Sequence, residues 1–521
     1  MSTGSTARLP ESASTGDGAP EPPLWRAALG SHAAFWLALA VLVVRSPGFH
    51  SAILNIDECD HVIIARMMRA GAVPYVDVVE TKPPLLYVLF WAGSFLGHSV
   101  LPARLLAAVF LLGTVFLVRA AVHRWTGDAR AANAAGWCSL GASLLDPPWA
   151  ATEVFMNLGA AAALWSCVQA EREGSRGFDI LAGLAIGAAT LFKHQAVVLL
   201  PALSLAPFAS AVRGGGWGRA AGRTALIAAG FALPWSAALA AYASLGHAGD
   251  LVEWVFARNF GYVAAAHAGV WTRLSTVVFA VGGSALLWAL AVQEALRRRR
   301  DPLGIAFGAS LALTWLAVSA GGRFYQHYFL QFAPILGVLA GPALARVAAA
   351  WNTLTRARRA ALAAFLALPL LAYAAYGIAR AALHDYPAQD ARANALATWL
   401  GEHTAPGERV FVWGHFTPIY YSSDRLPGTR YLMTSVHMGN FDPGELPAGF
   451  DPAQHRSERD VRNTLEDLEA NRTALVVDTA PADIHHFSRV PLESFPELRD
   501  YIASHYAPAG ECSGARIYRR R

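Results

Sequence analysis

The residues best suited to chemistry gather in one stretch, "NIDECDHVIIARMMRAGAVPYVDVVETKPPLLY", which covers residues 55–87. The stretch begins with two adjacent carboxylates, Asp57 and Glu58, and later presents Lys82 directly before two prolines. A carboxylate can act as base on an incoming hydroxyl, and a lysine ammonium can stabilise a departing phosphate. The stretch therefore combines a candidate base with a candidate phosphate ligand.

Further polar groups come from distant places in the chain, and each lies at the end of an apolar run. They are Glu153 and Asn157, Lys193, and the group Arg323, Tyr325, His327 and Tyr328. A charge beside a membrane-spanning run is costly and is a functional hypothesis by default. We expect these groups and the 55–87 stretch to share one pocket.

Such a pocket suits transfer from a phosphate-linked donor. A glycoside hydrolase needs two carboxylates because its leaving alkoxide must take a proton, whereas a phosphate leaves already anionic. The hypothesis assigns catalysis to Asp57 and Glu58. It assigns binding of the donor phosphate to Lys82, Arg323, His327 and Lys193. It assigns other substrate contacts to Tyr87, Glu153, Asn157, Tyr325 and Tyr328.

The composition indicates which class of protein contains this pocket. The 521 residues are 55% hydrophobic and 15% charged, whereas soluble domains carry about 25% charge. A polytopic α-helical membrane protein is expected. The net charge of +5 is assigned to lysine and arginine on the cytoplasmic face, not to nucleic-acid binding. Four scattered cysteines match no zinc or redox spacing; a Cys59–Cys512 disulfide is the alternative to four free thiols.

Eleven apolar runs are candidate spans. They lie near 27–45, 101–122, 130–146, 153–170, 179–196, 197–212, 222–245, 273–295, 303–320, 328–349 and 360–380. The run 84–97 is shorter than the roughly 20 residues that a span needs. If it does not span, every arginine-rich connection falls on the side of the N-terminus, as the positive-inside rule requires. We therefore expect 84–97 to form an interfacial or re-entrant helix on the outer face.

This topology divides the chain into three parts. Residues 1–26 form a disordered cytoplasmic tail, residues 27–382 the transmembrane domain, and residues 383–521 an α/β domain outside the membrane. The transmembrane domain includes an outer loop over 46–100 with juxtamembrane helices. In the last part, 409–414, 474–479 and 515–520 read as strands and 460–472 as an amphipathic helix.

Local signals indicate how Asp57 and Glu58 are positioned. Asn55 and Glu58 have the spacing of a capping box, which predicts a helix from there to about Ala70 that ends at Gly71. Both acids would lie in its first turn, where the helix N-terminus favours ionised carboxylates.

Several motifs resemble bacterial members of the GT-C glycosyltransferase superfamily. They are "DECDHVIIARMMRAG", "PYVD…TKPPLLY", "TE" at 152–153 and "GRFYQHYFLQFAPIL" at 322–336. The resemblance covers roughly residues 27–350 and is most specific over Asp57–Tyr87. It is nearest to protein mannosyltransferase-like and aminoarabinose-transferase-like enzymes.

The resemblance implies an inverting transfer of a sugar from a polyprenyl-phosphate donor, at the outer face of the bacterial cytoplasmic membrane. The acceptor would be a lipid, a glycan or a protein. Asp57 matches the family's proposed base, Glu58 its neighbour, and Lys82 the lysine linked to the donor phosphate. Glu153 matches a second outer acid, where many relatives have Asp. The nearest relatives imply no cofactor.

Three alternatives stay open at this point. A lipid or sugar transporter would place its ionisable groups near the bilayer midplane on broken helices. A divalent metal could be held by Asp57, Asp60 and His61. A scaffold could bind a partner or acceptor through Trp413, His415, Tyr420 and Tyr421, which otherwise read as packing at a strand end.

Overall fold

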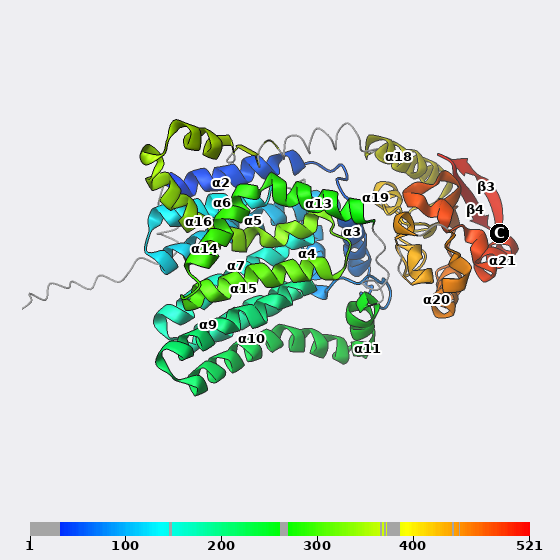
Figure 1. Ribbon diagram of the computed structural model, residues 1–521. Helices are drawn as coiled ribbons and strands as arrows, with labels where there is room; N and C mark the ends of the chain where they lie inside the picture. The colour runs from blue at the N-terminus through cyan, green and yellow to red at the C-terminus, as the bar shows by residue number, and fades with distance from the viewer. Residues whose placement is uncertain are drawn as a thin grey trace, which may run out of the picture.

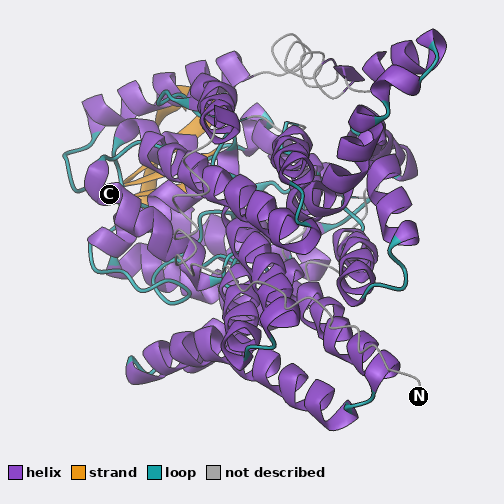
Figure 2. Ribbon diagram, turned by 90° about the vertical axis from the view of Figure 1, so that its left-hand side faces the viewer, coloured by secondary structure: helices purple, strands orange, loops and turns teal. Residues whose placement is uncertain are grey.

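The computed structural model describes residues 32–144, 148–260, 269–364, 367–368, 371, 386–439, 442–446 and 449–521. Its long helices run side by side, and a smaller domain with a β-sheet lies at one end of them (Figure 1). Figure 2 looks along the helices from the opposite end, so that the strands lie behind them. The predicted tail over 1–26 lies outside the described residues.

The helical part contains both long and short elements. In chain order they are α2 (His32–Arg45), η1 (Ser46–Gly48), α3 (Ile56–Arg69), α4 (Pro84–Gly93), η2 (Ser94–Leu96), α5 (Leu101–Thr126), α6 (Ala129–Ala142), α7 (Thr152–Glu173), α8 (Arg176–Thr190), η3 (His194–Val198), α9 (Leu199–Gly214), α10 (Trp217–Ser244), α11 (Ala248–Val252), η4 (Glu253–Ala257), α13 (Val270–Gly283), α14 (Ala285–Arg297), α15 (Pro302–Ala320), η5 (Gln326–Phe332), α16 (Ala333–Ala349) and η6 (Trp351–Thr353).

Within the described residues, 5 helices are long and apolar enough to cross a membrane, or 6 if the α13–α14 pair, bent by 75°, is one span. The 5 are Leu101–Thr126, His194–Gly214, Trp217–Ser244, Pro302–Ala320 and Gln326–Ala349. The prediction of a polytopic helical fold is therefore confirmed, whereas the count of eleven spans stays a prediction. Most of the run 360–380 lies outside the described residues.

Close packing between the long helices depends on small residues. A Cβ added to Gly341 of α16 would lie 2.5 Å from Cα of Ala135 in α6. A Cβ added to Gly183 of α8 would lie 2.0 Å from the carbonyl oxygen of Ile227 in α10. Small residues at such crossings let helix backbones approach closely, which is how helices pack in lipid.

Ion pairs join neighbouring helices at one end of the bundle. At the C-terminal end of α7, Glu171 pairs with Arg223, which also binds Asp179 at the start of α8 (2.5 and 2.9 Å). At the C-terminal end of α14, Glu294 pairs with Arg298 (2.7 Å) and with Arg346 of α16. Candidate site residues lie at the opposite ends of three of these helices, since Glu153 is in the first turn of α7, Lys193 follows α8 and His327 precedes α16.

The C-terminal domain is a small α/β unit. Its strands are β1 (Val410–Trp413), β2 (Leu475–Asp478), β3 (Tyr506–Cys512) and β4 (Ala515–Arg520), in the order β1-β2-β4-β3. β1 and β2 are parallel, and the other neighbours are antiparallel. Its longer helices are α18 (Tyr386–His403), α19 (Pro418–Ser423), α20 (Glu458–Ala470) and α21 (Pro496–His505). Its short 3-10 segments are η7 (Thr434–Met438), η8 (Pro443–Glu445), η9 (Pro452–His455), η10 (Ala480–Ala482), η11 (Ile484–Arg489) and η12 (Leu492–Ser494).

This architecture confirms the three predicted strands and the predicted helix over 460–472, and adds β3. Two residues of the proposed acceptor surface are core: Trp413 and Tyr420 are 0% and 1% exposed. Tyr421 instead faces the helical part, where its hydroxyl donates to the carbonyl of Ser51 (2.9 Å).

The C-terminal domain contacts the same segments that carry the candidate site. Arg66 of α3 donates to the carbonyls of Tyr420 and Tyr421 (3.4 and 3.3 Å). The backbone N–H of Val79 donates to the carbonyl of Arg430 (2.9 Å). The domain is therefore docked on α3 and on the segment before Lys82.

Candidate functional site

The helix that carries Asp57 begins where the sequence predicts. The side chain of Asn55 accepts a hydrogen bond from the backbone N–H of Asp57 (2.9 Å), and α3 ends at Arg69 before Gly71, whose φ is +95°. The capping box is only half formed. Glu58 accepts from the N–H of Leu54 (3.1 Å) instead of that of Asn55, because its carboxylate is drawn toward other partners.

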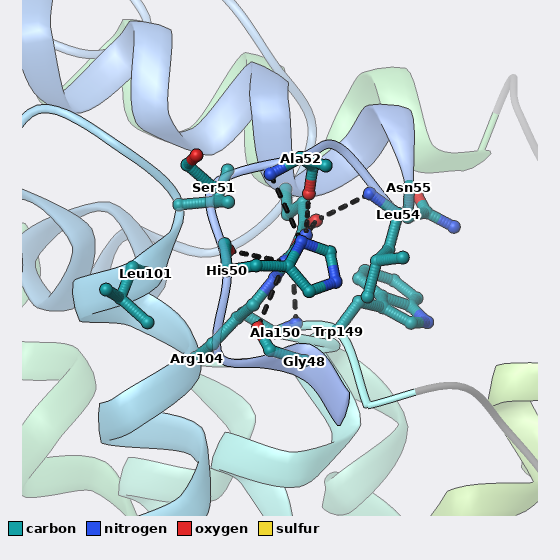
Figure 3. A network of polar contacts seen from close by, with 12 residues as sticks. Gly48, His50, Ser51, Ala52, Leu54, Asn55, Leu101, Arg104, Trp149 and Ala150 are labelled. Atoms are coloured by element: carbon teal, nitrogen blue, oxygen red, sulfur yellow. Dashed lines mark hydrogen bonds and ion pairs between the residues drawn. The ribbon is translucent and has the colours of Figure 1, made fainter. Parts of the chain in front are cut away.

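Those partners make Glu58 a buried anchor. Figure 3 shows the surroundings of its partner Arg104, with Gly48, His50 and Ala52 close by. Its carboxylate pairs with Arg104 of α5 and accepts from the N–H of Ala150 (3.1 Å), and both charged side chains are 0% exposed. Arg104 also donates to the carbonyls of Gly48, His50 and Ala52 (3.1, 2.9 and 2.8 Å). Glu58 therefore fixes the start of α3 against α5 and has no surface to offer a substrate.

Asp57 points into a different environment. Its carboxylate lies 3.7 Å from Nζ of Lys82, and these side chains remain 29% and 26% exposed. Glu80 lies 3.5 Å from the same Nζ and accepts from the hydroxyl of Tyr87. The arrangement brings the candidate base and the candidate phosphate ligand together, as expected, and adds Glu80, which the sequence reasoning did not single out.

The electrostatics of this cluster favour ionised carboxylates. Burial is the largest single influence on the pKa of Asp57 and would raise it. The charge of Lys82, together with smaller effects of His327, His61 and His415, outweighs burial and holds the pKa well below its usual range. Burial likewise opposes ionisation of Glu80, whose pKa is lowered by Lys82 and by the hydrogen bond from Tyr87. Lys82 thus stabilises two negative charges at once.

A second cluster forms around Glu153, in the first turn of α7. Glu153 is fully buried and pairs with Lys193, and Nε2 of His327 lies 4.0 Å from its carboxylate. Nζ of Lys193 lies 4.1 Å from the centre of the Tyr328 ring, a cation–π contact. Three segments far apart in the sequence therefore converge here, as predicted.

The two clusters adjoin each other. Asp57 interacts electrostatically with His327 as well as with Lys82, and Lys193 interacts with both Lys82 and Asp57. The ring of Tyr325 stacks on that of His327 at 5.7 Å between centroids. Asp57 has the most exposed carboxylate among the acids of this combined site, because the side chains of Glu80 and Glu153 are 17% and 0% exposed and that of Asp57 is 29% exposed.

Two predicted residues lie at the margin of the site. Arg323 is 2% exposed and pairs with Glu445 of the C-terminal domain (3.0 Å). It also donates a hydrogen bond to the hydroxyl of Tyr325 (3.1 Å). That hydroxyl donates in turn to the carboxylate of Asp442 (3.3 Å). Asn157 is buried one turn beyond Glu153 and donates to the carbonyl of Leu330 (2.8 Å). Arg323 thus joins the site to the C-terminal domain, and Asn157 ties α7 to η5.

His61 also lies in the site, four residues after Asp57 on the same face of α3. Its ring is 5.0 Å from that of Phe90 and 6.0 Å from that of Tyr87, and burial lowers its pKa to about 3. Among the described residues, neither ring nitrogen has a hydrogen-bond partner. His61 is thus a neutral polar group beside Lys82 and Asp57.

No group of three or more His, Cys, Asp or Glu side chains within the described ranges has the arrangement of a metal site. Asp60, one of the three residues of the alternative metal site, instead accepts from Thr417 (2.6 Å) and contacts Nε2 of His415 (3.0 Å). All four cysteines are free thiols, so the Cys59–Cys512 disulfide is not formed.

A cavity of about 250 Å³ lies apart from these residues, between the end of α3 and the C-terminal domain. Asp77, Arg409, Arg430 and Asp467 contribute its charged lining. Arg430 and Asp467 already form an ion pair (2.7 Å). We do not assign the reaction to this cavity, because none of the candidate residues lines it.

Comparison with known proteins identifies the fold. No protein-family model and no curated protein sequence matches the chain. Two crystal structures of ArnT from Cupriavidus metallidurans are similar, one bound to undecaprenyl phosphate and one in the apo state. Their TM-scores are 0.61 and 0.59 at 15% and 16% identity, and each match covers 94% of this chain and 98% of the other.

A third similar structure is the Archaeoglobus fulgidus oligosaccharyltransferase tethered with an acceptor peptide containing the NVT sequon. Its TM-score is 0.52 at 14% identity, and the match covers 95% of this chain and 74% of that one. The chain therefore shares its fold with these proteins, as the resemblance to the GT-C superfamily implied.

Proposed function

From a GT-C fold with Asp57 and Lys82 at one end of its helices, we propose that this chain is an inverting membrane glycosyltransferase. It moves a sugar from a polyprenyl-phosphate donor to a hydroxyl acceptor, which is a lipid, a glycan or a protein. The observation that carries the proposal is the 3.7 Å contact between two partly exposed groups, the Asp57 carboxylate and the Lys82 ammonium.

The chemistry follows from this pair. When the donor phosphate binds Lys82, the ammonium exchanges its contact with Asp57 for the phosphate oxygens, and the carboxylate becomes free to accept the acceptor's O–H. The acceptor oxygen attacks the anomeric carbon from the face opposite the phosphate. A new C–O bond forms, the C–O bond to the phosphate breaks, and the proton passes to Asp57.

The phosphate gains one negative charge as it leaves, and the neighbouring cations stabilise that charge. We assign Lys82 the direct contact and propose Lys193 and His327, which share Glu153, as its neighbours in the site. Arg323 adds a buried guanidinium at the side of the C-terminal domain. Tyr325, Tyr328 and Tyr87 supply aromatic surface for the sugar. We assign Glu58 to anchoring α3, since its carboxylate is fully buried against Arg104.

We place the site at the outer face of the cytoplasmic membrane, with the N-terminus inside and the C-terminal domain outside. The arginine-rich ends of the helices support this orientation by the positive-inside rule. A polyprenyl tail can then stay in the bilayer while its phosphate meets Lys82. A transporter would instead concentrate ionisable groups at the midplane, whereas Asp57 and Glu153 lie in first turns of helices.

Substitution of Asp57 by Asn tests the proposal. Asn has nearly the same shape, and Asp57 contributes only its backbone N–H to the cap by Asn55. We expect the purified full chain to fold and to bind polyprenyl phosphate, while transfer from a polyprenyl-phosphate sugar falls about 10²- to 10⁴-fold.

Asp424 provides a matched control, since it is an exposed acid that pairs with Arg66 (3.3 Å) away from the cluster. Asp424→Asn should leave turnover near that of the wild type. If Asp57→Asn retained full turnover, Asp57 would not be the base.

A further inference from the structure

The C-terminal domain reaches into the site through a contact with α3. Asp60 lies one turn after Asp57 and is 6% exposed. One carboxylate oxygen accepts from the hydroxyl of Thr417 (2.6 Å), and the other lies 3.0 Å from Nε2 of His415. Both partners lie in the short connection between the end of β1 and the start of α19. These two elements fix their positions in the C-terminal domain.

The spacing of Asp57 and Asp60 gives this contact a consequence for the base. Residues three apart on a helix share one face, so holding Asp60 fixes the rotation of α3 about its axis and the direction in which Asp57 points. The first turn of α3 is held on its other side by Glu58 and Arg104. Asp57 is thus positioned by one anchor in the helical part and one in the C-terminal domain.

Charged and titratable groups act on His415 from both parts of the molecule. Asp60, Asp57 and Lys82 act on it from the helical part, and the His485 ring lies 6.1 Å away in the C-terminal domain, beside Asp442. Burial alone would lower the pKa of His415, but Asp60 and then Asp57 outweigh burial and raise it. The short distance to Asp60 and the raised pKa both favour an ion pair between the His415 imidazolium and the Asp60 carboxylate.

We propose that His415 is a positioning residue of the transfer reaction: through Asp60, the C-terminal domain orients the Asp57 carboxylate and completes the site. The proposal rests on the proposed function for its kinetic part. It assigns the C-terminal domain a positioning role in the transfer reaction, beyond docking or acceptor binding.

The sign of the pH dependence follows from the raised pKa. The ion pair is complete below the ordinary histidine pKa of about 6.5 and is lost as the pH rises through the raised value. Turnover of the wild type should therefore show a basic limb. His415→Gln keeps a hydrogen-bond donor but cannot ionise. We expect it to lower kcat about 10- to 100-fold, as misplacement of a catalytic group does, with little change in KM and without the basic limb.

Asp60→Asn should reproduce these effects. The double variant Asp60→Asn/His415→Gln should have a kcat no lower than that of either single variant, because both substitutions remove the same contact. Arg258→Gln is the matched control. It breaks a different contact between the same two parts, the pair of Arg258 with Asp460 (2.9 Å), and should keep the basic limb. A His415→Gln variant with the wild-type limb, or loss of the limb in Arg258→Gln, would overturn the proposal.

Hydrogen exchange in residues 56–62 tests the contact without any transfer assay. Exchange in the wild type, corrected for its intrinsic pH dependence, should increase as the pH rises through the His415 transition, and His415→Gln should remove this step. If hydrogen exchange shows this pH-dependent step but the protein has no transferase activity, the proposed function is refuted and the contact of His415 with Asp60 is supported. Transfer without the step would refute the role of His415 alone.

Discussion

At the scale of single residues, the acids of the site differ in how much of each side chain is exposed to solvent. Glu58 and Glu153 are fully buried against Arg104 and Lys193, whereas Asp57 keeps 29% of its side chain exposed. Burial of an ion pair is tolerated because each charge satisfies the other. An acceptor hydroxyl must reach its base directly, so Asp57 is the carboxylate suited to that role.

The mutual dependence of Asp57 and Lys82 leads to a pH prediction. Lys82 is the strongest of four groups that together hold the pKa of Asp57 well below its usual range against the effect of burial, so Asp57 stays ionised throughout the usual assay range in the wild type. The Lys82→Met variant lacks the charge that opposes burial most strongly, so the pKa of Asp57 rises. We expect the residual kcat/KM to gain an acid limb, measured as a pH–rate profile.

Lys82→Arg is the control for this prediction, because it retains the charge. Its profile should lack the acid limb even if turnover falls through altered geometry. An unchanged profile in Lys82→Met would mean that Lys82 does not control the ionisation of Asp57.

At the scale of elements, α3 is short and depends on its anchors. The pair of Glu58 with Arg104 joins it to α5, and Arg104 also holds three carbonyls of the preceding loop. Removing one partner leaves the other charge buried and unpaired. We expect Glu58→Gln to lower the free energy of unfolding by about 3–5 kcal/mol, measured by thermal or denaturant unfolding in detergent.

Glu497→Gln is the matched control, since it breaks the more exposed pair of Glu497 with Arg456 (3.1 Å). Pairs of that kind contribute about 0–1 kcal/mol, so its unfolding should match the wild type. If Glu58→Gln kept the stability of the wild type but lost turnover, the result would instead support a catalytic role for Glu58.

At the scale of the whole molecule, the orientation in the membrane decides which face the site serves. Cys512 lies in β3 of the C-terminal domain and is partly exposed, whereas Cys59, Cys138 and Cys167 are buried. We expect a membrane-impermeant maleimide to label Cys512 in right-side-out vesicles and not in inside-out vesicles. Cys512→Ser should remove the label, and the reverse pattern would place the C-terminal domain in the cytoplasm.

Much of this protein could be predicted from local sequence patterns. The cap at Asn55, the end of α3 before Gly71 and the strands β1, β2 and β4 depend on neighbouring residues or on short apolar runs. The motif around Lys82 indicated the superfamily, and the fold agrees with it. The edge strand β3 was missed because its residues are mostly exposed and carry no apolar pattern; pairing with β4 stabilises it.

Only the tertiary structure decided what each charge does. Asp57 and Glu58 are adjacent and chemically alike in the sequence, yet Glu58 meets Arg104, 46 residues away, and Asp57 meets Lys82. Likewise, Asp60 and His415 are 355 residues apart, and no local pattern pairs them. A carboxylate's role depends on its partners and on its access to solvent, which are set by how distant segments pack and not by the spacing of residues along the chain.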